Sequence, residues 1–278
     1  VSLSPGAKLQ GLKEPEQRFK MNMKIIVALV LLTTSLCMVP GVLASDFDHS
    51  KFDQTLKKYV DEKGLVDYNG FAADPVFAEY VQSLQTVKVE ELSTDGQLAF
   101  WINAYNAVTI DKVIKKKPKK SVRETFVPGV WTSTTFFTSR EHTVANRPLS
   151  QDDIEHEILR KQFGDPRIHF AIICASRGCP PLPRIAYTEA NVQARLEDET
   201  RKYLNSPRGT RMDPAENTLF LSKLFDWFSG DFVQKSGSVL AFIRPYLNDG
   251  TLSFLEREPM ISYIHYDWSL NAQAPLEG

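Results

Sequence analysis

The chain contains 278 residues, of which 42% are hydrophobic and 24% are charged, and this balance is typical of a globular protein with a sizeable buried core. The length allows one large domain or two small ones. Because the 33 basic residues are balanced by 34 acidic ones, the composition argues against a nucleic-acid partner.

The N-terminal region has the pattern of a secretory signal peptide. Lys24 precedes an apolar run over residues 25–36, and small residues ending at Ala44 offer a cleavage site. The run is too short to span a bilayer comfortably, so we expect no transmembrane span once the signal is removed. The expected parts of the chain are upstream sequence at residues 1–20, the signal peptide at 21–44 and a single globular domain at 45–278, exported to the periplasm or secreted.

Helices are the first elements predicted within this domain. The apolar spacing indicates an amphipathic helix over residues 46–63 and another that begins at Asp74-Pro75. Thr94-Asp-Gly-Gln97 matches a capping box, and the helix that it starts should run to about Lys116. Since this third helix is apolar on most of its circumference, we expect it to be central and buried.

Two asparagines, Asn103 and Asn106, lie about one turn apart on the third helix and should be in or near the core. A buried amide without hydrogen-bond partners costs roughly 1–3 kcal/mol, so both side chains must find partners. Two interpretations remain open. The amides hold a neighbouring loop in place, or one of them polarises a substrate carbonyl or orients a catalytic imidazole.

A hairpin, a helix and a strand are predicted in the middle of the chain. Residues 131–146 are rich in Thr, Phe and Val, which favours a β-hairpin, and Ser150-Gln-Asp-Asp153 caps a helix that runs to about Phe163. After Gly164-Asp-Pro166, residues 168–174 are apolar on both faces, which is typical of a strand buried on both sides. The fold class that follows is α+β: a single domain whose helices pack on a small mixed sheet around this central strand.

The central strand would lead into a loop that carries two thiols. Small and flexible residues, with Ser176 and Arg177 among them, allow the chain to turn after Cys174, and two prolines stiffen it after Cys179. A stiff loop that leaves a buried strand is a common way to present reactive groups, although it is also a common way to end a strand.

Several short motifs follow one another along the chain. They are Phe100-Trp-Ile-Asn-Ala-Tyr-Asn-Ala107, Asp153-Ile-Glu-His156 with Leu159-Arg160, His169-Phe-Ala-Ile-Ile-Cys-Ala-Ser-Arg-Gly-Cys-Pro-Pro-Leu182, Leu221-Ser-Lys223 with Asp226-Trp-Phe228 and Asp231-Phe232, and Tyr266-Asp-Trp-Ser-Leu-Asn271. In sequence and in order they resemble the motifs of the domain of unknown function 547 family. The sequence departs from the family's pattern at Ile173, where a polar residue is expected. The resemblance implies one domain over most of the chain after about residue 50. Because the family has no settled activity, it implies no mechanism.

A thiol nucleophile is one chemical interpretation of the loop. Cys174 is preferred because it would end a rigid strand, whereas the prolines after Cys179 prevent a helix from starting directly behind it. The base would be His156 or His265, since a straight strand would place His169 on the opposite face from Cys174 and roughly 17 Å away, in the core. A histidine that precedes the cysteine in the chain would resemble a circularly permuted papain-like arrangement.

A structural disulfide is the competing interpretation. Two nearby cysteines in an oxidising compartment can pair, and Cys174–Cys179 would then close a short loop. The protein would in that case be a non-catalytic binding module of the cell envelope, and two inert thiols are a third reading. Under either function, the expected partner is an envelope peptide, amide or protein.

Carboxylates offer the last set of candidates. Asp226, Asp231 and Asp267 could serve glycoside hydrolysis if two of them faced each other, but the sequence does not indicate such a pair. Since recognisable metal-ligand spacing and cofactor motifs are missing, we predict neither a metal nor a cofactor. The candidate binding residues are Trp101, Tyr105, Ser176, Arg177, Cys179, Asp226 and Asp267.

Overall fold

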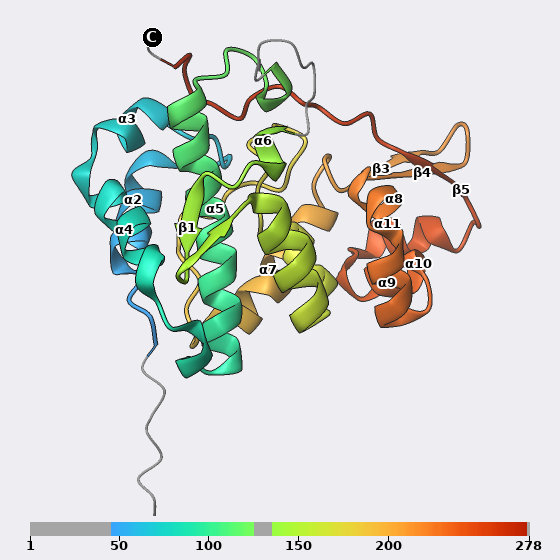
Figure 1. The fold of residues 1–278 in the computed structure, drawn as a ribbon. Coiled ribbons are helices and arrows are strands. Elements are labelled where there is room, and N and C mark those ends of the chain that lie inside the picture. The colour runs from blue at the N-terminus through green and yellow to red at the C-terminus, as the bar shows by residue number, and fades with distance from the viewer. Residues whose placement is uncertain (1–45, 125–134, 277–278) are drawn as a thin grey trace, which may run out of the picture. The chain divides into compact units, whose positions relative to one another are not determined.

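The computed structural model describes residues 46–124 and 135–276. The predicted signal peptide at residues 21–44 and the first part of the predicted hairpin, residues 131–134, lie outside the described residues. Within the described ranges, no helix is both long enough and apolar enough to cross a membrane. These residues belong to one compact unit, whose arrangement is drawn in Figure 1.

Helices make up most of the described chain. The α-helices are α2 (Ser50–Tyr59), α3 (Tyr68–Ala73), α4 (Pro75–Ser83), α5 (Thr94–Lys116), α6 (Thr135–Thr138), α7 (Val192–Leu204), α8 (Leu224–Trp227), α9 (Ser229–Ser236), α10 (Val239–Ile243) and α11 (Asp249–Leu255). Short 3₁₀ turns are η1 (Leu84–Thr86), η2 (Val89–Glu91), η3 (Val122–Glu124), η5 (Pro166–Phe170) and η6 (Arg244–Tyr246), while η4 (Asp153–Phe163) is a π-helix.

The described strands form two small sheets. β1 (His142–Val144) pairs with β2 (Arg147–Leu149) in an antiparallel hairpin. In the second sheet β4 (Thr218–Leu221) lies between β3 (Thr210–Asp213), to which it is antiparallel, and β5 (Met260–Tyr263), to which it is parallel. The combination of helices with a small mixed sheet confirms the predicted α+β class.

Helix α5 is the centre of the first hydrophobic core, as predicted. Its cap is one residue earlier than the predicted capping box, because the Ser93 hydroxyl accepts a hydrogen bond from the Gly96 N–H at 3.1 Å. The helix ends at Lys116, and Lys117 follows it in the left-handed conformation with φ 48°. Helices α3, α4, α7 and η4 pack around α5, so that most of its side chains are buried (Figure 1).

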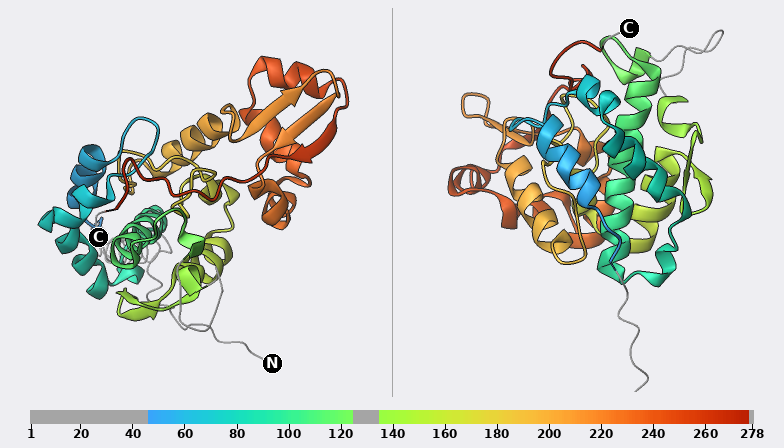
Figure 2. Two further views of the ribbon diagram at one scale, coloured as in Figure 1. Left: turned by 90° about the horizontal axis from the view of Figure 1, so that it is seen from above. Right: turned by 90° about the vertical axis from the view of Figure 1, so that its left-hand side faces the viewer.

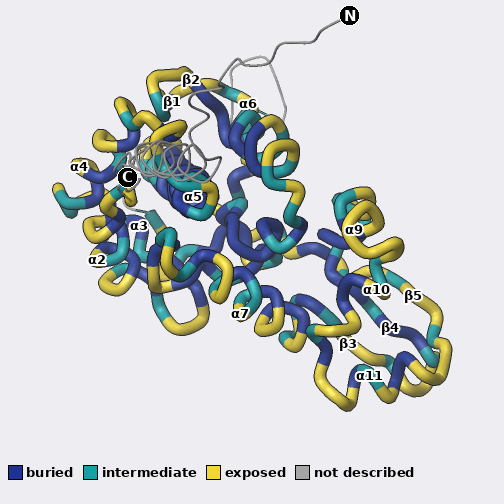
Figure 3. Tube along the Cα trace, turned by 90° about the horizontal axis from the view of Figure 1, so that it is seen from below, coloured by how far each residue is buried: buried dark blue, intermediate teal, exposed yellow. Residues whose placement is uncertain are grey.

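A second hydrophobic core lies between β4 and helices α8 to α11. Its aromatic centre includes Phe225, Phe232 and Phe242, and the last two have ring centroids 4.8 Å apart. Figure 2 shows these helices and the three-stranded sheet gathered at one end of the compact unit. In Figure 3 the buried stretches gather in the middle of the trace, while exposed ones follow the outer loops.

The predicted central strand at residues 168–174 is wrong. Residues 166–170 form η5 instead, and the Asp165 side chain caps this turn by accepting a hydrogen bond from the Arg167 N–H at 3.0 Å. Asp-Pro is a helix-start signal, and here it outweighs the β-branched character of the residues that follow. The burial predicted for the segment is confirmed, since Ile168 and Ile173 are each 1% exposed.

The predicted hairpin at 131–146 is also misplaced. In the described part of that range, residues 135–138 form α6, and the hairpin of β1 and β2 begins only at His142. Its turn is made by Ala145 and Asn146, which both have positive φ. Two consecutive left-handed residues match the right-handed twist of a tight hairpin, which fixes the turn at this position.

Candidate functional site

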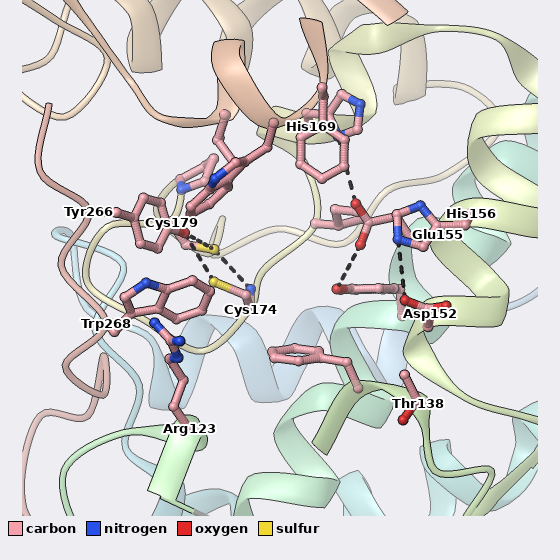
Figure 4. A pocket seen from close by; sticks show the side chains of 17 residues that line it. Arg123, Thr138, Asp152, Glu155, His156, His169, Cys174, Cys179, Tyr266 and Trp268 are labelled. Carbon is pink, nitrogen blue, oxygen red and sulfur yellow. Dashed lines mark hydrogen bonds and ion pairs between the residues drawn. The ribbon is translucent and has the colours of Figure 1, made fainter. Parts of the chain in front are cut away.

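A pocket of ≈ 310 Å³ opens where the two hydrophobic cores meet. Its lining comes from α5, η3, α6, η4, η5, the thiol loop (residues 174–179), α8 and the segment that follows β5. Figure 4 shows Cys174 and Cys179 on the same side of the pocket as Tyr266, with Glu155 and His156 on the other side. Two thiols therefore face a carboxyl and an imidazole across a cavity that is otherwise largely apolar.

The sulfurs of Cys174 and Cys179 share one hydroxyl partner, that of Tyr266. The Tyr266 hydroxyl lies 3.1 Å from the Cys174 sulfur and 3.2 Å from the Cys179 sulfur, and Ser176 Oγ lies 3.0 Å from the Cys174 sulfur. Burial raises the pKa of Tyr266, so its hydroxyl remains a protonated donor at neutral pH. Since Cys174 is partly exposed while Cys179 is buried, Cys174 is the sulfur that a ligand in the pocket can reach.

The thiol loop is fixed by backbone contacts at both ends. Asn106 Oδ1 accepts a hydrogen bond from the Ile173 N–H at 3.0 Å, and its amide donates to the Ala171 carbonyl at 2.9 Å. Gly178 approaches the backbone of Asp267 so closely that a Cβ at residue 178 would lie 2.9 Å from the Asp267 nitrogen. These contacts fix the backbone of the loop and therefore the positions of the two sulfur atoms.

Glu155 is the acid group on the opposite side of the pocket. Its side chain is 14% exposed, and this burial raises its pKa to about 7. The Tyr105 hydroxyl donates to Glu155 Oε2 at 3.2 Å, and His169 Nδ1 lies 3.8 Å from Glu155 Oε1. A carboxyl group whose pKa is close to neutrality can both donate and accept a proton at physiological pH.

His169 is held beside Glu155 by an ion-paired carboxylate. Its Nε2 lies 2.8 Å from Asp231 Oδ2, and Arg160 donates to both oxygens of Asp231 at 2.7 Å. Burial lowers the pKa of His169, whereas hydrogen bonds from His169 and Arg160 hold the pKa of Asp231 well below its usual range against the opposing effect of burial. A neutral His169 therefore carries its proton on Nε2, and its Nδ1 faces Glu155 as an acceptor.

The π-helix η4 and the residue before it, Asp152, present three of the polar side chains. The Ser150 hydroxyl accepts a hydrogen bond from the Asp153 N–H at 3.0 Å, so the predicted start of this helix is confirmed. Asp152, Glu155 and His156 line the pocket, and His156 Nε2 lies 3.3 Å from Asp152 Oδ1. π-Helical turns are rare and occur frequently at functional sites.

Several predicted site residues meet at this pocket. Cys174, Cys179, Tyr105 and His156 line it, and Ser176 contacts the Cys174 sulfur.

The two predicted asparagines serve the backbone rather than the pocket. Asn103 exchanges hydrogen bonds of 2.7 and 3.0 Å with the carbonyl and the N–H of Tyr187, as Asn106 does with the residues before Cys174. Because each amide is already engaged through both its oxygen and its nitrogen, this geometry agrees with the loop-holding interpretation and gives no support to an oxyanion role.

The other predicted residues lie away from the thiols. His265, Arg177 and Asp267 line a second pocket instead. Trp101 is buried beneath the guanidinium of Arg147, and Asp226 is paired with Lys223 at 2.7 Å. The expectation that His265 is the base for Cys174 therefore has no geometric support, since His265 is exposed while its neighbour Tyr266 faces the sulfurs.

Sequence reasoning missed Glu155, Tyr266 and the contribution of His169 to the pocket. The signal for the first two is that both belong to motifs that resemble those of the family, Asp153-Ile-Glu-His156 and Tyr266-Asp-Trp, from which the sequence favours His156 and Asp267 instead. His169 was expected in the core, and it is buried there, but its ring also lines the pocket.

The fold and the pocket define an α+β protein with a thiol pair at the wall of an apolar cavity. The family model described as "Protein of unknown function, DUF547" matches residues 89–204, which confirms over this region the resemblance that the motifs predicted. Among curated proteins and among solved structures, no match to the chain was found. Across residues 46–124 and 135–276, no three His, Cys, Asp or Glu side chains come together as a bound metal ion requires.

Proposed function

We propose that the protein is an exported thiol-dependent hydrolase or acyl transferase that acts on peptide or amide bonds. The proposal is based on two reactive groups that line the same pocket. Cys174 is a partly exposed thiol, and Glu155 is a carboxyl group whose pKa is about 7. A nucleophile and an acid–base group that line the same cavity are the minimum that acyl transfer needs.

In the proposed reaction the Cys174 thiolate attacks the carbonyl carbon of the substrate. The carbon–nitrogen bond breaks, and neutral Glu155 gives its proton to the leaving amine, which leaves a thioester on Cys174 and a carboxylate on Glu155. Glu155 then takes a proton from a water molecule, which attacks the thioester and releases the acid and the thiolate. In acyl transfer, an amine takes the place of this water.

The hydroxyls near Cys174 support its role as nucleophile. The hydroxyls of Ser176 and Tyr266 each have one proton to donate, and donation to the Cys174 sulfur would stabilise its thiolate over the thiol. Asn106 would act as a positioning residue, because it fixes the backbone directly before Cys174. The base proposed from the sequence changes accordingly. Glu155 takes the role first assigned to a histidine, with His156 beside it on η4, and the papain-like arrangement stays a prediction.

The reactivity of Cys174 tests this proposal. The purified protein, fully reduced, would be treated with iodoacetamide between pH 5 and pH 9, and the alkylated cysteine identified by mass spectrometry. We expect Cys174 to react at pH 6 to 7 faster than a free thiol of pKa about 8.5, and Cys179→Ser to retain this reactivity. If Cys174 reacts no faster than a free thiol, the thiol mechanism is wrong.

A binding module with a Cys174–Cys179 disulfide is the second candidate. It is favoured by two observations: both sulfurs contact the Tyr266 hydroxyl, and the Cys179 sulfur accepts a hydrogen bond from the Cys174 N–H at 2.9 Å. The exported protein would be weighed intact with and without reductant, and a disulfide form would be lighter by about two hydrogens. Two alkylatable thiols in the unreduced protein would exclude this candidate and leave the enzyme.

A further inference from the structure

A second pocket, of ≈ 270 Å³, lies behind the thiol loop. Gly178 and Tyr266 belong to its lining, and Tyr266 also lines the first pocket. Four basic side chains line it as well: Arg177, Arg208, Lys223 and His265. Three of these side chains, those of the two arginines and the lysine, are cationic, although the formal net charge of the chain is −1.

The two arginines of this pocket use few of their guanidinium N–H donors in hydrogen bonds to the described residues. Among the described residues, the Arg177 guanidinium donates to the carbonyl oxygens of Leu270 and Ala272 at 3.3 and 3.4 Å, and that of Arg208 donates to the carbonyl of Cys179 at 3.4 Å. A guanidinium carries five N–H donors, so most of them remain available on both side chains. Within the described part of the chain, neither arginine forms an ion pair with a carboxylate.

The lining of the second pocket has a net positive charge even when the carboxylate of Asp267 is included. Asp267 lines it, and hydrogen bonds from the Ser269 hydroxyl and N–H lower its pKa, so that it is ionised at neutral pH. Arg177, Arg208 and Lys223 are opposed by this single carboxylate in the lining, although Lys223 also pairs with Asp226 outside it at 2.7 Å. The excess of one to two positive charges matches an oxyanion, and the charge of a phosphate group in particular.

We propose that this second pocket binds the phosphate group of a small ligand, through Arg177 and Arg208 with Lys223 and His265 beside them. A phosphate offers more acceptor oxygens than a carboxylate and so can engage two guanidinium forks at once. The inference goes beyond the proposed thiol chemistry and does not depend on it, since no residue named as a donor lines the first pocket.

Binding at this site would restrict the movement of the thiol loop. Arg177 belongs to the loop itself, and the Arg208 guanidinium donates to the carbonyl of Cys179. The Tyr203 hydroxyl adds a contact of 3.3 Å to the Gly178 carbonyl. A phosphate held by both arginines would therefore link residues 177 and 179 of the loop to the chain near residue 208.

Titration calorimetry with inorganic phosphate at pH 7 tests the proposal, with acetate as a second probe. We expect one saturable phosphate site, with acetate binding at least about tenfold more weakly. The double variant Arg177→Gln plus Arg208→Gln should weaken phosphate binding by at least about tenfold. The control is Arg211→Gln, which removes an arginine that stacks on Phe220 outside the pocket, and it should leave the affinity unchanged.

A measurement on the unaltered protein covers the case in which the double variant fails to fold. Phosphate should shift the imidazole resonances of His265 in an NMR titration and leave those of the distant His49 in place. Cys174→Ser should bind phosphate as tightly as the unaltered protein, so that a failed thiol mechanism is distinguishable from a failed phosphate site. No saturable binding, equal binding by the double variant or an unmoved His265 would each overturn the proposal.

Discussion

Replacing Glu155 with glutamine tests the electrostatics of the pocket directly. The glutamine side chain has the shape of a neutral glutamic acid, so Glu155→Gln fixes the protonated form without opening a cavity. In the folded protein, burial raises the pKa of Glu155 from its ordinary 4.5 to about 7. The folded protein therefore holds this proton more tightly than the unfolded chain does.

The sign of the pH effect follows from that difference. A carboxyl group with a raised pKa contributes stability that is fully present below pH 4.5, the pKa of the unfolded chain, and is lost as the pH rises through about 7. Between pH 5 and pH 8 the loss from Glu155 alone is about 2.5 kcal/mol in the free energy of unfolding. Because the glutamine does not titrate, the variant should lack this loss and be the more stable protein at pH 8.

Urea unfolding of both proteins at pH 5 and pH 8 measures the effect. The quantity of interest is the change with pH in the unaltered protein minus that in the variant, because other titrating groups largely cancel in this difference. Glu157→Gln is the matched control, since Glu157 lies on the same helix but is 58% exposed and paired with Lys161 at the surface. If Glu155→Gln changes with pH as the unaltered protein does, Glu155 is already ionised at pH 5 and its assigned acid–base role is refuted.

Three further substitutions test how the pocket is held. Asn106→Ala should lower the free energy of unfolding by about 3 kcal/mol, because it leaves a buried carbonyl and a buried N–H without their partner; a loss below about 1 kcal/mol in urea would contradict this. Gly178→Ala should cost about 1–3 kcal/mol, since the added carbon meets the backbone of Asp267 at 2.9 Å, and an unchanged melting temperature would show that the loop can move aside. Asp231→Asn should lower stability by about 3 kcal/mol at pH 7, because Arg160 loses its charged partner, and a neutral outcome in urea would mean that solvent replaces the ion pair.

Helix limits were predictable where the signals are local. The range 94–116 for α5 and the end of η4 at Phe163 both agree with the structure. In each case a capping side chain lies close to the start of the helix and a stop signal lies close to its end, so a short window of sequence contains the physical cause of each limit. The π-helical winding of η4 was not predictable in the same way, since its residues have no pattern that separates it from an α-helix.

The segment before Cys174 shows where local signals compete. Residues 168–174 have the composition of a buried strand, and they are buried, but Asp165 and Pro166 start a 3₁₀ turn before any strand partner is reached. A strand needs a neighbour to pair with, and no residue within 46–124 or 135–276 forms a strand pairing with residues 168–174. The backbone of Ala171 and Ile173 is satisfied by one amide, that of Asn106, which comes from 65 residues away along the chain.

The composition of the site was harder to predict than its location, because it depends on which face each residue presents. Cys174, Cys179, His156 and Tyr105 line one pocket. Of the neighbours on the segment after β5, Tyr266 contacts the sulfurs, whereas His265 lines the second pocket alone. The segment that carries them has no regular secondary structure, so no periodicity in the sequence predicts which way each side chain points.

The raised pKa of Glu155 was equally hard to predict from the sequence. Its raised pKa arises from burial beside Tyr105 and His169, which are 50 and 14 residues away in the chain. The residues next to Glu155 in the sequence therefore do not indicate that its charged form is costly. A sequence can thus indicate that a carboxyl group belongs to a functional motif, while its capacity to exchange a proton at neutral pH follows only from the packing around it.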